Sequence, residues 1–162
     1  AWSASGADLN ARLKKDYRLY SARPGFWQTL AFVANQSAGA DRVAVVGAFN
    51  EMSGSLVRWS LALNGKTAGL EVVDGPSRRK SIRKWLEEER PERVLAIRPL
   101  PTSRFYGKDF QSYNAWQLAA IDSLEKAEGW QVKRRRRFEG LEMEVVVLEP
   151  SLQGQSRVAP RF

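Results

Sequence analysis

The chain has 162 residues, of which 43% are hydrophobic, and a formal net charge of +8 at pH 7. This length is sufficient for one domain with a buried core, and no apolar run approaches the roughly 18 to 20 residues of a membrane span. The sequence contains neither Cys nor His, which excludes disulfides, thiol nucleophiles, serine-histidine triads and the usual zinc sites within it. We therefore expect no metal site, and no cofactor is indicated.

The ends of the chain differ from its middle. Residues 1–22 place Leu9, Leu13 and Tyr17 on one helical face among cations, which predicts an N-terminal amphipathic helix or linker. The segment 23–150 reads as an α/β domain, and residues 151–162 read as a loose tail of low apolar content. Because the chain starts with Ala rather than Met, we expect it to be part of a longer protein.

Short apolar strands alternate with amphipathic helices through the first part of the domain. A helix is predicted from Pro24 to Gly39, followed by strands over 43–46, 69–73 and 93–98. The helix after the first strand has its apolar residues at Leu56, Trp59 and Leu63. The helix after the second strand is expected from about Ser77 to the residue before Pro91, with an apolar stripe at Ile82, Trp85 and Leu86. This alternation implies right-handed crossovers and a parallel sheet.

The last part of the chain departs from that alternation. Residues 99–111 read as an irregular segment, and Ser112 is a candidate cap for a helix that ends before Gly129. The runs 130–138 and 141–148 predict an antiparallel hairpin at the margin of the sheet. The fold class expected is therefore α/β, three-layer and Rossmann-like, with a mostly parallel sheet of about five strands and a C-terminal antiparallel hairpin.

Ligands of open α/β sheets bind where the strands end in loops, so the loops around residues 50, 74 and 104 are expected to form one rim. The dinucleotide pattern G-x-G-x-x-G and the phosphate-binding P-loop are both absent, so a structural turn at 47–55 competes with a ligand-binding one. Helix capping and an Asp-Gly-Pro turn likewise explain several of these polar residues. The ligand-binding candidates are Asn50, Glu51, Ser53, Ser55, Asp74, Arg104 and Tyr106. No catalytic constellation is recognisable.

A run of five cations lies inside the first strand of the hairpin. Because side chains of a strand alternate between its faces, a buried strand cannot hold these residues, and the strand must lie at an edge. One reading is charge that protects an edge against aggregation. The other is a surface for anionic lipid headgroups or a phosphorylated sugar, with nucleic acid less favoured because exposed aromatic residues are not expected beside the cations. The residues are Lys133, Arg134, Arg135, Arg136 and Arg137.

The stretch 41–63, above all Val45 to Trp59, and the later run RPERVLAIRPLP resemble the C-terminal extramembrane region of bacterial polytopic membrane glycosyltransferases of the protein mannosyltransferase and aminoarabinose transferase type. The resemblance implies a non-catalytic accessory domain, attached to the transmembrane part of its own parent chain. The parent would use a lipid-linked sugar phosphate, and the domain would be membrane-associated and lie outside the cytoplasm. The family's catalytic acids belong to loops between membrane spans, so none is carried onto this chain.

The strand order, with a terminal hairpin after alternating strand and helix units, also resembles S-adenosylmethionine-dependent methyltransferases. That alternative implies a Rossmann-like enzyme that binds a nucleotide or S-adenosylmethionine. The chain departs from the family after the first strand, where Val46-Gly47-Ala48-Phe49 stands in place of an acidic residue followed by Gly-x-Gly.

Overall fold

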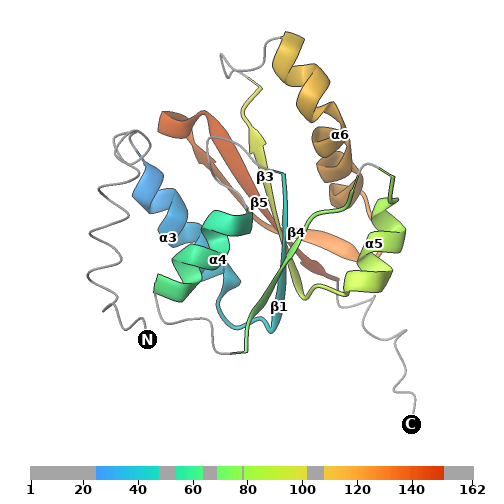
Figure 1. The fold of residues 1–162 in the computed structure, drawn as a ribbon, viewed down its shortest axis with the longest axis horizontal. Helices are drawn as coiled ribbons and strands as arrows, with labels where there is room; N and C mark the ends of the chain where they lie inside the picture. The colour runs from blue at the N-terminus through green and yellow to red at the C-terminus, as the bar shows by residue number, and fades with distance from the viewer. Residues whose placement is uncertain (1–24, 48–53, 64–68, 78, 102–107, 152–162) are drawn as a thin grey trace, which may run out of the picture.

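The computed structural model describes residues 25–47, 54–63, 69–77, 79–101 and 108–151 (Figure 1). The predictions for residues 1–22 and for the tail from 152 lie outside these ranges. Helices and strands alternate before a terminal pair of strands, in the order α3 (Phe26–Ser37), β1 (Arg42–Val46), α4 (Gly54–Leu63), β2 (Glu71–Asp74), α5 (Ile82–Glu89), β3 (Arg93–Pro99), α6 (Lys108–Glu125), β4 (Trp130–Phe138), the 3₁₀ helix η1 (Glu139–Leu141) and β5 (Met143–Pro150).

The five strands form one sheet in the order β2-β1-β3-β5-β4. β1 is parallel to both β2 and β3, whereas β5 is antiparallel to β3 and to β4. It follows that β1, β2, β3 and β4 run in the same direction, and that β5 is inserted between β3 and β4 in the reverse direction. The predicted α/β class, the parallel first strands and the terminal hairpin are confirmed.

The strands of the sheet centre are apolar on both faces. In β1, Val43 and Val45 contribute to one core cluster, and Ala44 and Val46 contribute to the other. The side chains of β3 and β5 are divided between the two clusters in the same way, because successive side chains of a strand point to opposite faces. Helices α3 and α4 lie on the side of the first cluster, and α5 and α6 lie on the other side (Figure 1).

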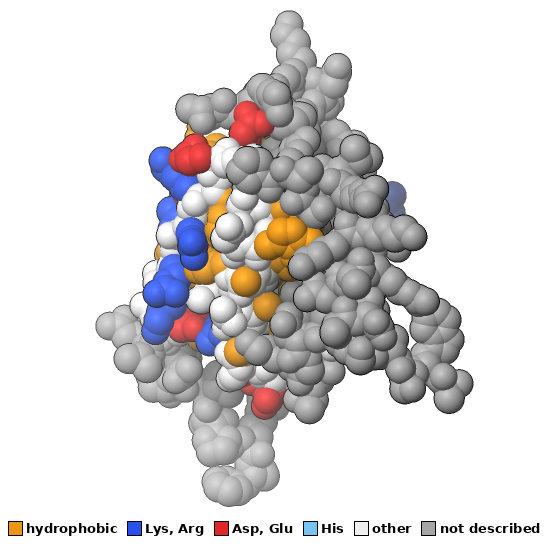
Figure 2. All heavy atoms as spheres, turned by 90° about the vertical axis from the view of Figure 1, so that its left-hand side faces the viewer, with side chains coloured by type: hydrophobic (Ala, Val, Ile, Leu, Met, Phe, Trp, Pro, Cys, Tyr) orange, Lys and Arg blue, Asp and Glu red, His pale blue; other side chains and the backbone are white. Residues whose placement is uncertain are grey.

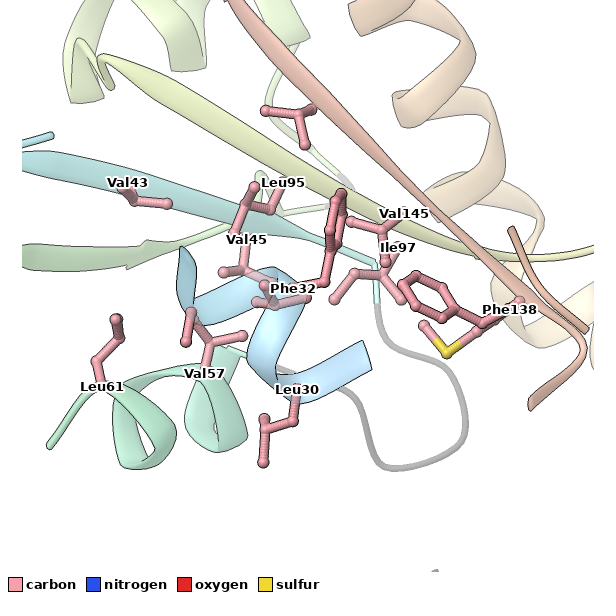
Figure 3. Packing of buried hydrophobic residues seen from close by; sticks show 14 of the residues in the cluster. Leu30, Phe32, Val43, Val45, Val57, Leu61, Leu95, Ile97, Phe138 and Val145 are labelled. Atoms are coloured by element: carbon pink, nitrogen blue, oxygen red, sulfur yellow. The ribbon is translucent and has the colours of Figure 1, made fainter. Parts of the chain in front are cut away.

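The cluster under α3 and α4 explains why these helices form where they do. Leu30 and Phe32 from α3 and Val57 and Leu61 from α4 meet the valines of β1 and the apolar residues of β3 and β5 (Figure 3). Val57 is 0% exposed and Leu61 is 1% exposed. Each such side chain contributes about 1.5 to 3 kcal/mol when it is removed from water.

Four predictions about element boundaries and faces are wrong. Trp59 is 36% exposed, whereas Val57 and Leu61 of the same helix are buried. β2 begins at Glu71 and not at Gly69, and α5 begins after Ser81, whose hydroxyl accepts a hydrogen bond from the backbone N–H of Lys84. α6 already begins at Lys108, so that Ser112 lies within the helix and does not cap it.

None of the described helices is long and apolar enough to cross a membrane.

Candidate functional site

The carboxyl ends of β1, β2 and β3 lie at the same edge of the sheet, as their parallel pairing requires. The segments 48–53 and 102–107 connect the ends of β1 and β3 to α4 and α6. Asn50, Glu51, Ser53, Arg104 and Tyr106 belong to these segments and lie outside the described residues. The described candidates at this edge are therefore Asp74 and Ser55, and Ser55 is exposed in the first turn of α4.

Asp74 ends β2 and lies beside the first residue of α4. A Cβ atom added to Gly54 would be 2.8 Å from Oδ1 of Asp74, so glycine leaves room for the carboxylate at the helix N-terminus. Such a position is favourable, because the partial positive charge of a helix start attracts an anion. The same Oδ1 is 3.1 Å from Nη2 of Arg58, and the Asp74 side chain is 74% exposed. Asp74 thus has a structural role and remains accessible to a ligand.

Arg58 links α4 to the edge strand β2. Its Nε and Nη2 donate to the backbone carbonyl of Val72 over 3.1 and 2.8 Å, while Nη2 also faces Asp74. A polar hollow of about 460 Å³ lies along this strand, and its lining includes Arg42, Arg58, Asp74 and Lys80. This volume is within the range of small-molecule sites.

Two glycines at the strand ends serve close packing of the backbone. Gly47 has φ +83°, and a Cβ there would stand 2.2 Å from the carbonyl oxygen of Ile97 in β3. At Gly75 a Cβ would lie 3.2 Å from the carbonyl oxygen of Val45. The approach of neighbouring strands is sufficient to explain both glycines, which favours the structural interpretation of the turn that begins at Gly47.

The cations of β4 are divided between the two faces of the sheet. Arg134 and Arg136 are paired in register with Val147 and Val145, whose side chains belong to the α3 and α4 cluster. The guanidinium of Arg136 lies 5.3 Å from the ring centre of Phe32 and 5.0 Å from that of Phe138. Figure 2 shows Lys and Arg side chains gathered along one margin of the face that carries α3, beside exposed hydrophobic side chains.

On the other face, Arg135 and Arg137 converge on Glu144 of β5. Nη1 of Arg135 and Nε of Arg137 are 2.8 and 3.3 Å from the Glu144 carboxylate, and Nε of Arg98 is 2.9 Å from it. Glu144 is only 3% exposed. Burial alone would raise the pKa of Glu144, but hydrogen bonds from Arg98 and Arg135 outweigh this effect and hold its pKa below the usual value. This cluster was not predicted, because the strand register that brings its members together is not readable from the sequence.

Lys133, the remaining cation of the run, lies at a register irregularity between Val132 and Arg134. Its Nζ is 3.5 Å from Oε2 of Glu149, and its side chain is 62% exposed. The five cations therefore do not form one uniform patch. Those on the α6 face are neutralised by carboxylates, while those on the α3 face remain as exposed positive charge.

A larger groove of about 1400 Å³ lies between α5 and α6, and nothing in the sequence indicated it. Its apolar lining includes Ile82, Leu86, Trp116 and Trp130. The cations at its margin are paired, since Arg83 bonds Glu87 over 3.0 Å and Lys80 bonds Glu88. Within the described ranges, no group of acidic side chains is arranged to hold a metal ion.

The described residues thus define an α/β domain with a mixed, five-stranded sheet and a polar hollow along its end strand β2. No family model matches the chain, and no curated protein matches it. One solved structure, titled "Structure of the Mitomycin 7-O-methyltransferase MmcR", is similar with 13% sequence identity and a TM-score of 0.35. The similarity covers 93% of this chain and 74% of that chain. A likeness at this level says nothing about function.

Proposed function

We propose that the chain is a Rossmann-like, three-layer domain that binds a nucleotide-type ligand, S-adenosylmethionine above all, where its parallel strands end. The observation that carries this proposal is the strand order. The connection from β1 leads to β2 on one side, whereas β3 lies on the other side of β1. In open α/β sheets, ligands bind outside the carboxyl ends of the strands at such a switch point.

The reversed last strand supports S-adenosylmethionine over other nucleotide-type ligands. Four strands share one direction, and β5 alone is inserted against them, beside β3 and β4. The resemblance of the sequence to S-adenosylmethionine-dependent methyltransferases depends on a terminal hairpin after alternating strand and helix units, and β4 and β5 form such a hairpin.

Asp74 is the residue we propose to hold the ligand's ribose. In dinucleotide-binding folds an acidic residue of this kind accepts hydrogen bonds from the ribose hydroxyls. Its present partner is Arg58, and the side chains of this pair are 74% and 42% exposed. An exposed ion pair contributes only about 0 to 1 kcal/mol, so its rearrangement by a ligand costs little. The polar hollow beside Asp74 provides the space.

Titration calorimetry tests the proposal, with S-adenosylmethionine, NAD⁺ and a nucleotide sugar as separate probes. We expect heat of binding with S-adenosylmethionine, and a loss of about tenfold in affinity for Asp74→Asn, which removes a charged hydrogen-bond acceptor. Asp122→Asn is the matched control, because Asp122 is also an exposed carboxylate paired with an arginine, Arg98, and it lies on α6, outside the lining of the hollow. No heat with any of the three probes would contradict the proposal.

The second candidate is the accessory domain of a membrane glycosyltransferase that the resemblance over Val45 to Trp59 implies. The observation that favours it is the exposed positive charge of Arg134 and Arg136, which suits anionic headgroups or a lipid-linked sugar phosphate. The test is the reading frame that encodes this segment. Hydrophobic spans encoded upstream of Ala1 would support the candidate, and a frame without such spans would exclude it.

A further inference from the structure

β4 is an end strand of the sheet, and no other described strand pairs with its outer edge. It has nine residues and pairs only with β5, and every residue from 131 to 137 is exposed. An end strand presents a row of backbone N–H and C=O groups that can pair with another extended segment. At about 3.4 Å per residue, this edge is about 30 Å long.

The charges of β4 select what can pair with this edge. On the α6 face, Arg135 and Arg137 already bond the carboxylate of Glu144. On the α3 face, no carboxylate among the described residues is paired with Arg134 or Arg136. These two cations stand two residues apart on one face, which separates their positions by about 7 Å along the strand. The rings of Phe32 and Phe138 hold the Arg136 guanidinium in place.

We propose that the β4 edge binds an extended acidic protein segment as an additional strand of the sheet. An added strand lies about 4.8 Å away and repeats the same pleat, so acidic residues at alternate positions would face Arg134 and Arg136 directly. The backbone ladder supplies binding, and the spacing of the acidic residues supplies specificity. A second copy of β4 does not fit, because it would place like charges opposite one another. This inference does not depend on the ligand proposed to bind near β2, at the opposite edge of the sheet.

The test is calorimetry at low salt with a synthetic peptide of about ten residues that alternates glutamate with threonine, long enough to follow the strand. A peptide of the same sequence with all backbone amides methylated keeps the charge and cannot donate to the edge. We expect the unmodified peptide to bind and to protect the amides of β4 from hydrogen exchange. The methylated peptide should bind at least about tenfold more weakly, because the hydrogen bonds that the peptide donates to the β4 edge are lost.

Arg134→Glu should also weaken binding of the unmodified peptide by about tenfold, since it puts like charges opposite each other. Lys126→Glu is the matched control, because Lys126 is an exposed cation outside β4 and should leave the affinity unchanged. Equal affinity for the two peptides would overturn the proposal in favour of simple charge attraction. Binding to phosphatidylserine vesicles or to DNA, with no binding of the peptide, would overturn it in favour of a membrane or nucleic-acid surface.

Discussion

Arg98 and Glu144 stand opposite each other in the antiparallel pair of β3 and β5, and Nε of Arg98 donates to Oε2 of Glu144 over 2.9 Å. Arg135 of β4 donates to the same oxygen over 2.8 Å. Arg98 and Arg135 are also ion-paired with Glu125 of α6. A single buried carboxylate, Glu144, therefore joins the parallel part of the sheet to the terminal hairpin, and Glu125 connects two of its arginines to α6.

Replacement of Glu144 by Gln should destabilise the domain by about 2 kcal/mol, because the arginines around it lose a buried charged acceptor. Asp122→Asn is the control from the same cluster. The Asp122 side chain is 59% exposed and lies 3.3 Å from Arg98, so its loss should change the free energy of unfolding by less than about 0.5 kcal/mol. Urea unfolding at neutral pH measures both. Equal effects of the two substitutions would show that burial of Glu144 contributes nothing.

The same carboxylate should make stability dependent on pH in acid. The pKa of Glu144 lies below its usual value in the folded protein. A group of this kind contributes its stabilisation above the unfolded-state pKa, about 4.3 for glutamate, and loses it as the pH falls through the lower folded-state pKa. Urea unfolding at a series of pH values should therefore show a constant gap between wild type and Glu144→Gln near neutrality and a shrinking gap in acid. A gap that is the same at every pH would contradict this assignment.

Gly47→Ala should be more damaging than the same change at Gly39. Both glycines have positive φ values, +83° and +80°, so each substitution costs about 1 kcal/mol in backbone strain. Only at Gly47 would the new Cβ meet another atom, the carbonyl oxygen of Ile97 at 2.2 Å. We expect a further loss of about 2 kcal/mol there, since the backbone of β1 or β3 must shift. Thermal unfolding of the two variants tests this, and equal melting temperatures would refute the close approach.

The extent to which the sequence predicted the fold depends on which signal each element carries. β1, β3 and the two hairpin strands were predicted well, because each is too short for a typical helix and is bounded by glycine or proline. The burial of Val57 and Leu61 in α4 was not predicted. These residues also recur at helical spacing, and the packing of α4 against α3 and the sheet determines that they are buried. The start of α6 was placed too late, since Gly107 is the last helix-breaking residue before Lys108 and Ser112 was read as a cap.

The candidate site was predictable only as a location. The direction of β1, β2 and β3 followed from their alternation with helices, so their carboxyl ends could be placed at one edge. The partner of Asp74 could not be foreseen, because Arg58 reaches it from a helix whose rotation was unknown. The basic run was recognised as an edge strand, but the register irregularity after Val132 decides which arginines face Glu144, and no pattern in the sequence specifies it.

Arg93→Lys should destabilise the domain although the charge is kept. Arg93 begins β3, and its Nη1 donates to the backbone carbonyls of Gln36 and of Ala38, at the end of α3, the latter over 3.2 Å. Its Nε donates to Oε1 of Glu149 in β5 over 2.9 Å. The planar guanidinium makes these bonds at once, whereas a lysine ammonium is a single point charge that cannot satisfy the helix end and the carboxylate together.

We expect a loss of about 1 to 2 kcal/mol for Arg93→Lys in urea unfolding, which corresponds to one or two hydrogen bonds from a charged donor. Arg90→Lys is the matched control. Arg90 is exposed, and its Nε donates to the carbonyl of Glu87 in its own helix over 3.3 Å, so the substitution should be within about 0.5 kcal/mol of wild type. If Arg93→Lys proves equally neutral, the link from α3 through β3 to β5 does not depend on the guanidinium, and α3 must be held to the sheet by its apolar contacts alone.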